Sequence, residues 1–138
     1  MSIRFLDAKE IPNIKKRVNR DAEFRLAARY MSEDILIGAG DKQCIFKIRD
    51  GTLIDIVLNP TLLDKSSFYI KGPEKSWQIF LQRFPPPFYQ AFFSAVMRED
   101  FQFGGNMESI FAYYWAIQRL LNIMRILQNE RRRTNASN

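Results

Sequence analysis

The sequence contains no histidine and only one cysteine, Cys44, among 138 residues. Histidine is the commonest general base and the commonest metal ligand, so its absence removes every Ser-His and Cys-His nucleophile pair. A single cysteine excludes an internal disulfide and a cysteine metal cluster. We therefore predict a protein that is not an enzyme and that uses no metal or other cofactor.

Long apolar runs are absent as well. No segment reaches the length of a membrane-spanning helix, and the N-terminal residues hold no apolar run of the kind found in a signal peptide. The chain ends in Ala136-Ser137-Asn138, which is not a peroxisomal targeting tripeptide. We expect a cytoplasmic protein.

The net charge of +6 comes mostly from basic residues near the two ends of the chain. They are Lys15, Lys16, Arg17, Arg20, Arg25 and Arg29 at one end and Arg131, Arg132 and Arg133 at the other. These basic residues do not interleave with aromatic residues as single-strand binding surfaces require, so we expect no specific nucleic-acid binding. We expect solvated faces, at most peripheral membrane contact, and a single domain over 1–129 followed by a disordered basic tail, 130–138.

Aromatic side chains are concentrated between residues 68 and 111, and twelve phenylalanines make up most of the 14% aromatic content. Apolar residues at helical spacing predict a helix over Glu74–Phe84. Pro85-Pro86-Pro87 cannot continue that helix, so we predict a corner and a second ring-rich helix over Phe88–Arg98. The rings of this region either wall a hollow or fill a core, and the pattern alone does not separate the two.

A β-hairpin with one apolar face is predicted around Asp50-Gly51. A two-residue turn there would mix charge into both faces, which favours a three-residue loop, Arg49-Asp50-Gly51, with a bulge. The inward side chains are then Cys44, Phe46, Ile48, Ile54, Ile56 and Leu58, with Phe46 opposite Ile54 and Cys44 opposite Ile56.

Further strands are indicated at 34–38, 67–71 and 101–103, and helices are indicated at both ends of the chain. Residues 8–31 predict a helix that is interrupted at Asp21, whose side chain caps the second segment. Strands in meander order with helices at the chain ends predict an α+β fold, a mostly antiparallel sheet with helices over one face.

The last helix is predicted to be capped by Asn106 and to run to about Asn129. Its main apolar stripe is Met107, Ile110, Phe111, Tyr114, Ile117, Leu121 and Met124. Off that stripe lie Tyr113, Trp115, Leu120, Ile123 and Leu127. A helix that is apolar over more than half its surface is buried on two sides, lines a cavity or meets a partner.

Few residues of the sequence could form a catalytic site. Glu99-Asp100 is the only carboxylate pair in the aromatic region, and adjacent residues point apart, which makes a poor acid–base dyad. Tyr89, Tyr113 and Tyr114 could offer a hydroxyl inside a hollow. A cofactor-free enzyme that uses them is the least favoured interpretation.

Three motifs in order resemble the sterol carrier protein type 2-like family of lipid-binding domains over roughly residues 30–127. They are Phe46-Lys47-Ile48-Arg49-Asp50-Gly51 before a second strand, Gly72-Pro73 followed by Trp77, and Phe101-Gln102-Phe103-Gly104-Gly105-Asn106-Met107. The resemblance implies a sheet of about five strands covered by helices, with a hydrophobic tunnel that accepts sterols, fatty acids or acyl chains without chemistry. The proline corner and the many rings indicate a reshaped or narrowed tunnel.

The predicted ligand-binding residues are Trp77, Phe80, Phe84, Phe88, Phe92, Phe103, Met107, Phe111 and Tyr114. The function we predict is that of a non-catalytic carrier for an apolar ligand, which is a fatty acid, an acyl chain, a sterol-like compound or an aromatic compound. The alternative is an interaction module whose exposed apolar last helix meets a second copy of the chain or an enzyme partner.

Overall fold

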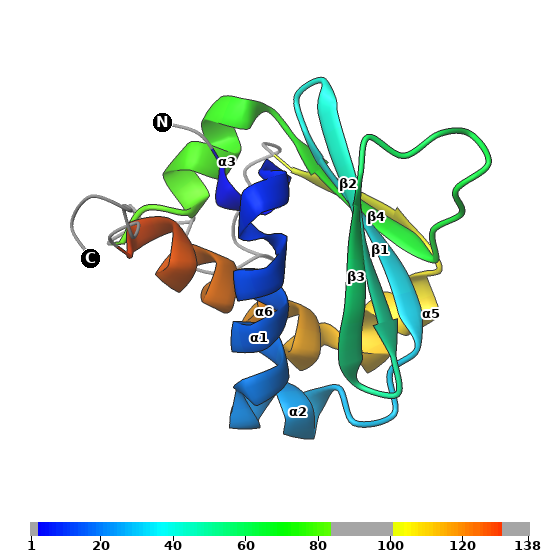
Figure 1. Cartoon of the computed structure of the whole chain (residues 1–138). Helices are drawn as coiled ribbons and strands as arrows, with labels where there is room; N and C mark the ends of the chain where they lie inside the picture. The colour runs from blue at the N-terminus through cyan, green and yellow to red at the C-terminus, as the bar shows by residue number, and fades with distance from the viewer. Residues whose placement is uncertain (1–2, 84–100, 131–138) are drawn as a thin grey trace.

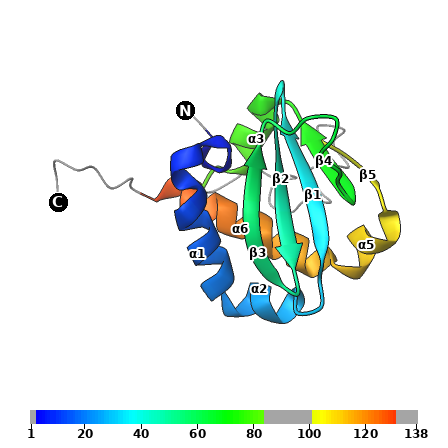
Figure 2. The same cartoon turned by 45° about the vertical axis from the view of Figure 1, so that its right-hand side comes forward.

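The computed structural model describes residues 3–83 and 101–130. It contains a five-stranded sheet in the order β3-β2-β1-β4-β5, with helices over one face (Figures 1 and 2). The strands are β1 (Glu33–Ala39), β2 (Lys42–Arg49), β3 (Thr52–Leu58), β4 (Phe68–Gly72) and β5 (Gln102–Gly105). The helical elements are η1 (Arg4–Leu6), η2 (Ala8–Glu10), α1 (Ile11–Arg20), α2 (Ala22–Ala27), α3 (Glu74–Phe80), α5 (Met107–Ala112) and α6 (Tyr114–Asn129).

The predicted α+β fold with a mostly antiparallel sheet is confirmed. Strands β1, β2 and β3 form an antiparallel meander, and β5 is antiparallel to β4. The predicted meander order is wrong at β4, which lies parallel to β1 on the side away from β2. Parallel neighbours cannot be joined by a tight hairpin, and the chain reaches this position through the long β3–β4 loop, seen beyond the sheet in Figure 1.

Two rows of apolar side chains cross the inner face of the sheet, because paired residues of neighbouring strands point to the same side. One row is Leu58, Cys44, Ile37, Ile70 and Phe103, and the other is Ile56, Phe46, Ile35 and Phe68. Most of these side chains are fully buried in the core that the helices cover. Burial raises the pKa of the Cys44 thiol, so this cysteine is a core residue and not a reactive thiolate.

The hairpin register predicted from the sequence is wrong. Asp50 and Gly51 both have positive φ, at 50° and 76°, which is the two-residue turn that matches the twist of the flanking strands. Phe46 pairs with Ile56, and the pairing shifts after Lys47, so that Ile54 is an extra residue with no partner in β2. Ile54 is consequently 44% exposed, although it was expected in the core. A tight turn and a bulge occur together, and the bulge restores the apolar face.

The N-terminal helices follow the prediction in their interruption at Asp21, although α2 ends at Ala27 and does not reach residue 31. Asp21 ends α1, and its carboxylate accepts a hydrogen bond of 2.8 Å from the backbone N–H of Phe24, which caps α2. Ile14 and Val18 of α1 and Phe24 of α2 are buried. Figure 2 shows α6 behind the sheet and α1 beside β3, and these side chains belong to the core between the helices and the sheet.

The predicted last helix is two helices. Asn106 caps α5 as expected, because its side chain accepts a hydrogen bond from Ser109 N–H. The helix then breaks at Tyr113, where the backbone leaves the helical region, and α6 begins at Tyr114. Both apolar sides of α6 are buried, since Ile117, Leu121 and Met124 of the main stripe and Leu120, Ile123 and Leu127 beside it are all covered.

The first ring-rich helix, α3, ends at Phe80 and is shorter than the predicted Glu74–Phe84. Pro73 stands at its N-cap position. The predicted proline corner and the second ring-rich helix lie outside the described residues.

Candidate ligand-binding site

Trp77 is fixed at the centre of the aromatic region by α3. The Trp77 N–H donates to the Pro73 carbonyl in the first turn, and the indole N–H donates a 2.8 Å hydrogen bond to the Gly38 carbonyl of β1. Its ring makes edge-to-face contacts with Phe5 at 5.4 Å, with Phe101 at 4.9 Å and with Phe80 at 5.9 Å between centroids. The indole therefore joins the sheet, the N-terminal turn and α3.

Trp77, Phe80, Phe101 and Leu121 meet where the inner face of the sheet reaches α3 and α6, and we name this group the aromatic junction. All four side chains are at most 3% exposed. The space between them has no room for a water molecule. Pockets for small-molecule ligands usually measure about 300–1,000 Å³. The junction is thus closed as it stands, and a ligand must separate its rings or lie against its border.

A larger hollow of about 360 Å³ lies beside the junction, lined by Arg83, Arg125, Ile126, Asn129 and Glu130. Arg125 links the two, because its guanidinium lies 4.6 Å from the centre of the Phe80 ring and its Nε donates to the Phe80 carbonyl at 2.8 Å. Burial lowers the pKa of Arg125. The site therefore sets a partly buried positive charge against an apolar interior.

The nine predicted ligand-binding residues fall into four groups. Trp77 and Phe80 lie in the aromatic junction. Phe103 and Tyr114 are half-buried and pack against the core, whereas Met107 and Phe111 are 39% and 58% exposed. Phe84, Phe88 and Phe92 lie outside the described residues. This set stays a prediction.

The prediction missed Phe101, Leu121 and Arg125 as members of this site. Phe101 alternates with Phe103 at a spacing of two, which indicates one face of a strand, so a signal was present. Arg125 follows Leu121 by four residues, which places both on one side of α6. No sequence pattern indicated that Arg125 would contact Phe80.

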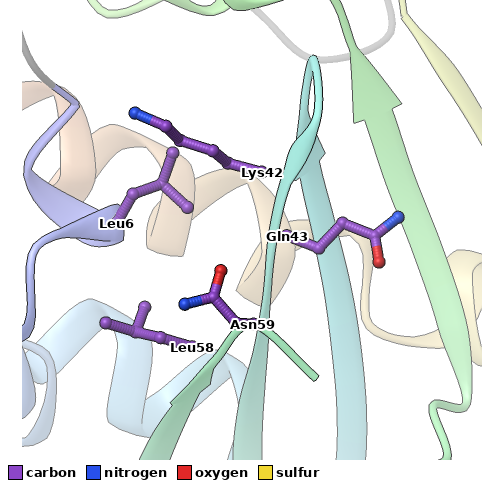
Figure 3. Close-up of a pocket in the computed structure, with 5 residues that line it drawn as sticks. All are labelled: Leu6, Lys42, Gln43, Leu58 and Asn59. Atoms are coloured by element: carbon purple, nitrogen blue, oxygen red, sulfur yellow. The ribbon is translucent and has the colours of Figure 1, made fainter. Parts of the chain in front are cut away.

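A second hollow opens at the edge of the sheet, where β2 begins and β3 ends. It measures about 160 Å³ and is lined by Leu6, Lys42, Gln43, Leu58 and Asn59 (Figure 3). Lys42 and Leu6 approach each other across it, and Gln43 points away from Leu6. It is smaller than the usual ligand pocket.

Two of the apolar side chains that the interaction-module interpretation expected to be exposed on the last helix are buried. Leu120 and Ile123 are 1% and 3% exposed, so they are core residues and not part of an open surface. Among the described residues, no group of three or more His, Cys, Asp or Glu side chains could hold a metal ion. No helix in residues 3–83 or 101–130 is long and apolar enough to cross a membrane.

Solved structures share this arrangement of sheet and helices. A conserved hypothetical protein from Thermus thermophilus, suggested to be a sterol carrier protein, superposes with a TM-score of 0.70 at 15% identity, covering 91% of each chain. A crystal structure of sterol carrier protein 2 gives 0.66 at 17% identity, covering 83% of this chain and 92% of that one. A UbiJ-SCP2 ubiquinone synthesis protein gives 0.53 at 8% identity, covering 82% and 90%.

No family model and no curated protein sequence matches this chain. At these identities the superpositions define the fold, which is that of sterol carrier protein 2. The fold that the sequence motifs implied is therefore confirmed.

Proposed function

We propose that this protein is a non-catalytic carrier that holds an apolar ligand between the inner face of the sheet and helices α3 and α6. The observation that carries the proposal is the aromatic junction, which stands at the covered face of a sterol-carrier-type fold. Of the predicted wall, Trp77, Phe80, Phe103 and Tyr114 are the described members that lie in the core or pack against it. Phe84, Phe88 and Phe92 complete the wall in this proposal.

The closed state of the junction is compatible with a carrier that fills its own site when empty. Edge-to-face ring pairs are worth about 0.5–1.5 kcal/mol each beyond area burial. An apolar ligand that replaces these contacts with its own would offset that loss through the apolar surface it removes from water, about 25 cal/mol per Å². We propose an acyl chain or a compact aromatic compound as the ligand, because the narrow junction suits a slender group better than a sterol.

The two tryptophans of the sequence allow a direct test, because Trp77 is 1% exposed and Trp115 is 73% exposed. In a Trp115→Phe variant, Trp77 is the only tryptophan, and we expect a brominated fatty acid to quench it saturably. In the matched Trp77→Phe variant, the same fatty acid in the absence of lipid vesicles should leave Trp115 emission unchanged.

Native mass spectrometry of the protein as purified should also reveal a bound apolar compound. Failure of fatty acids, sterols and small aromatic compounds alike to bind at roughly tens of micromolar would refute the carrier function.

A further inference from the structure

Helix α2 packs against α6, and the two helices border an open hollow of about 480 Å³. Leu26 and Ala27 of α2 and Trp115 of α6 supply its apolar lining. The Tyr113 hydroxyl donates to the Tyr30 carbonyl at 3.1 Å and so ties the end of α2 to the α5–α6 junction. We name Leu26, Tyr30 and Trp115, with Arg25 and Arg29, the α2–α6 face.

The large side chains of this face project into solvent. Leu26 is 66% exposed, Trp115 73% and Tyr30 76%. Single exposed apolar residues are ordinary on protein surfaces, but a contiguous group of them marks an interaction site. Leu26 and Trp115 line the same hollow. Trp and Tyr combine an apolar ring with a polar N–H or O–H, and they concentrate where apolar and aqueous phases meet.

Basic residues lie close to these exposed apolar side chains in the sequence. Residues 11–31 hold six basic and two acidic side chains, so this segment supplies four of the six net charges of the chain. The acidic Asp21 is engaged by Arg119, with oxygen–nitrogen distances of 2.7 and 2.9 Å. The other acid, Glu23, lines the hollow and also pairs with Arg119, at 3.6 Å. Arg25 and Arg29 are exposed and form no ion pair with the described residues, and Arg29 lies over the Tyr30 ring at 5.2 Å.

We infer that the α2–α6 face docks onto the surface of an anionic lipid bilayer. A second copy of the chain is disfavoured as the occupant, because a symmetric contact would bring the same arginines together. A bilayer provides a partner for each feature of the face. Leu26 and Trp115 would contact its apolar region, the amphipathic ring of Tyr30 would lie at the head-group level, and the guanidinium groups would pair with anionic head groups.

The first turn of α6 contributes to the α2–α6 face, and another side of the same helix packs against the protein interior. Trp115 points to solvent, whereas Leu121 lies in the aromatic junction. Docking would therefore bring the helix that covers the proposed ligand site to the membrane surface. The inference goes beyond carrier function and does not require it, since a protein can dock there without carrying a lipid.

The test uses the full chain with Trp77→Phe, in which Trp115 is the only tryptophan, after a thermal melt has shown that the variant folds. The probes are phosphatidylcholine vesicles with and without phosphatidylserine. We expect a blue shift of Trp115 emission, and quenching by brominated acyl chains, only with vesicles that contain phosphatidylserine. Binding should weaken as salt is added, because salt screens exposed charges.

Two matched double variants test whether vesicle binding depends on the position of the positive charges or only on their number. Arg25→Gln with Arg29→Gln should weaken vesicle binding about 30-fold, from the contribution expected of two basic residues at an anionic surface. Lys65→Gln with Lys75→Gln makes the same change of charge in the β3–β4 loop and on α3 and should have little effect. An equal loss in both pairs would overturn the inference, because binding would then follow net charge and not this face.

Three other outcomes would also overturn the inference. They are absence of vesicle binding, binding that leaves Trp115 emission unchanged, and a concentration-dependent dimer that shifts Trp115 emission without lipid. Binding of an acidic amphipathic peptide in place of vesicles would assign the face to a protein partner. None of these outcomes is read from the emission of Trp77, so failure here is distinct from failure of ligand binding in the Trp115→Phe variant.

Discussion

Arg125 is the residue from which we expect the proposed site to gain a preference among apolar ligands. Its guanidinium is partly buried against the Phe80 ring and borders the hollow that also holds Arg83. Removing a cation from water is costly unless an anion or hydrogen-bond acceptors compensate for the loss. The Phe80 carbonyl already accepts one hydrogen bond from Arg125. In the proposed complex, a carboxylate at one end of an acyl chain adds a charged acceptor at the guanidinium, while the chain itself enters the aromatic junction.

We therefore expect the protein to bind a fatty acid more tightly than the alcohol of the same chain length. Arg125→Gln should reduce that preference about tenfold, because a charge-assisted hydrogen bond is worth roughly 1.5 kcal/mol or more. Competition against a fluorescent fatty acid measures the effect, and Lys75→Gln on the exposed side of α3 is the control. Equal affinity of the unmodified protein for acid and alcohol would remove Arg125 from the site.

At the scale of secondary-structure elements, the β2–β3 hairpin provides the sharpest test of the observed register. Ile54 and Ile56 are two residues apart in β3, yet Ile54 is 44% exposed and Ile56 is 3% exposed. Ile56→Ala should lower the free energy of unfolding by about 2–5 kcal/mol, because it leaves a cavity in the core. Ile54→Ala should cost about 0.5 kcal/mol or less. Urea denaturation measures both, and equal losses would support the register without the bulge.

The same hairpin shows where sequence reasoning succeeds and where it stops. Alternation of apolar residues located both strands, and Asp50-Gly51 located the turn. The length of the turn and the presence of a bulge each change the pairing of β2 with β3 by one residue. The apolar pattern of the sequence depends only on the sum of the two changes. The bulge was therefore assigned to the loop, although it lies within β3 at Ile54.

Helix ends were predictable where a side chain makes the cap, as at Asp21 and Asn106. The break at Tyr113 has no glycine or proline to mark it, and the bond from the Tyr113 hydroxyl to Tyr30 joins residues far apart in the sequence. The aromatic junction is similar, because Phe80, Phe101 and Leu121 meet only after the chain has folded. Local patterns identify such elements, but long-range contacts assemble the site.

At the scale of the whole molecule, α6 is the element that holds the two ends of the chain together. Near its C-terminal end, the Gln128 side chain accepts a hydrogen bond from Arg4 N–H, and Glu130 just beyond it pairs with Arg17 at 2.6 Å. Near its start, Arg119 forms a two-pronged ion pair with Asp21. Three contacts along one helix thus fix η1, α1 and α2 over the inner face of the sheet.

The Asp21–Arg119 pair makes global stability depend on pH in a defined direction. The hydrogen bonds from the Arg119 guanidinium lower the pKa of Asp21 below its ordinary value of 3.8. The folded protein therefore holds this carboxylate in its ionised form more strongly than the unfolded chain does. The resulting stabilisation is present above pH 3.8 and is lost as the pH falls through the lowered pKa of the folded state.

Asp21→Asn isolates this contribution, because asparagine is as good a helix N-cap as aspartate but carries no charge. We expect the variant to be less stable than the unmodified protein by about 1 kcal/mol at neutral pH, as for a partly exposed ion pair of good geometry. The difference should shrink when urea denaturation is repeated well below pH 3.8, where the carboxylate of the unmodified protein becomes protonated. Asp41→Asn, in the exposed turn between β1 and β2, is the control for loss of a carboxylate that has no such ion pair among the described residues, and it should cause only a small loss of stability. A loss at Asp21 that is equally large in acid would mean that capping or packing, and not the ion pair with Arg119, joins α2 to α6.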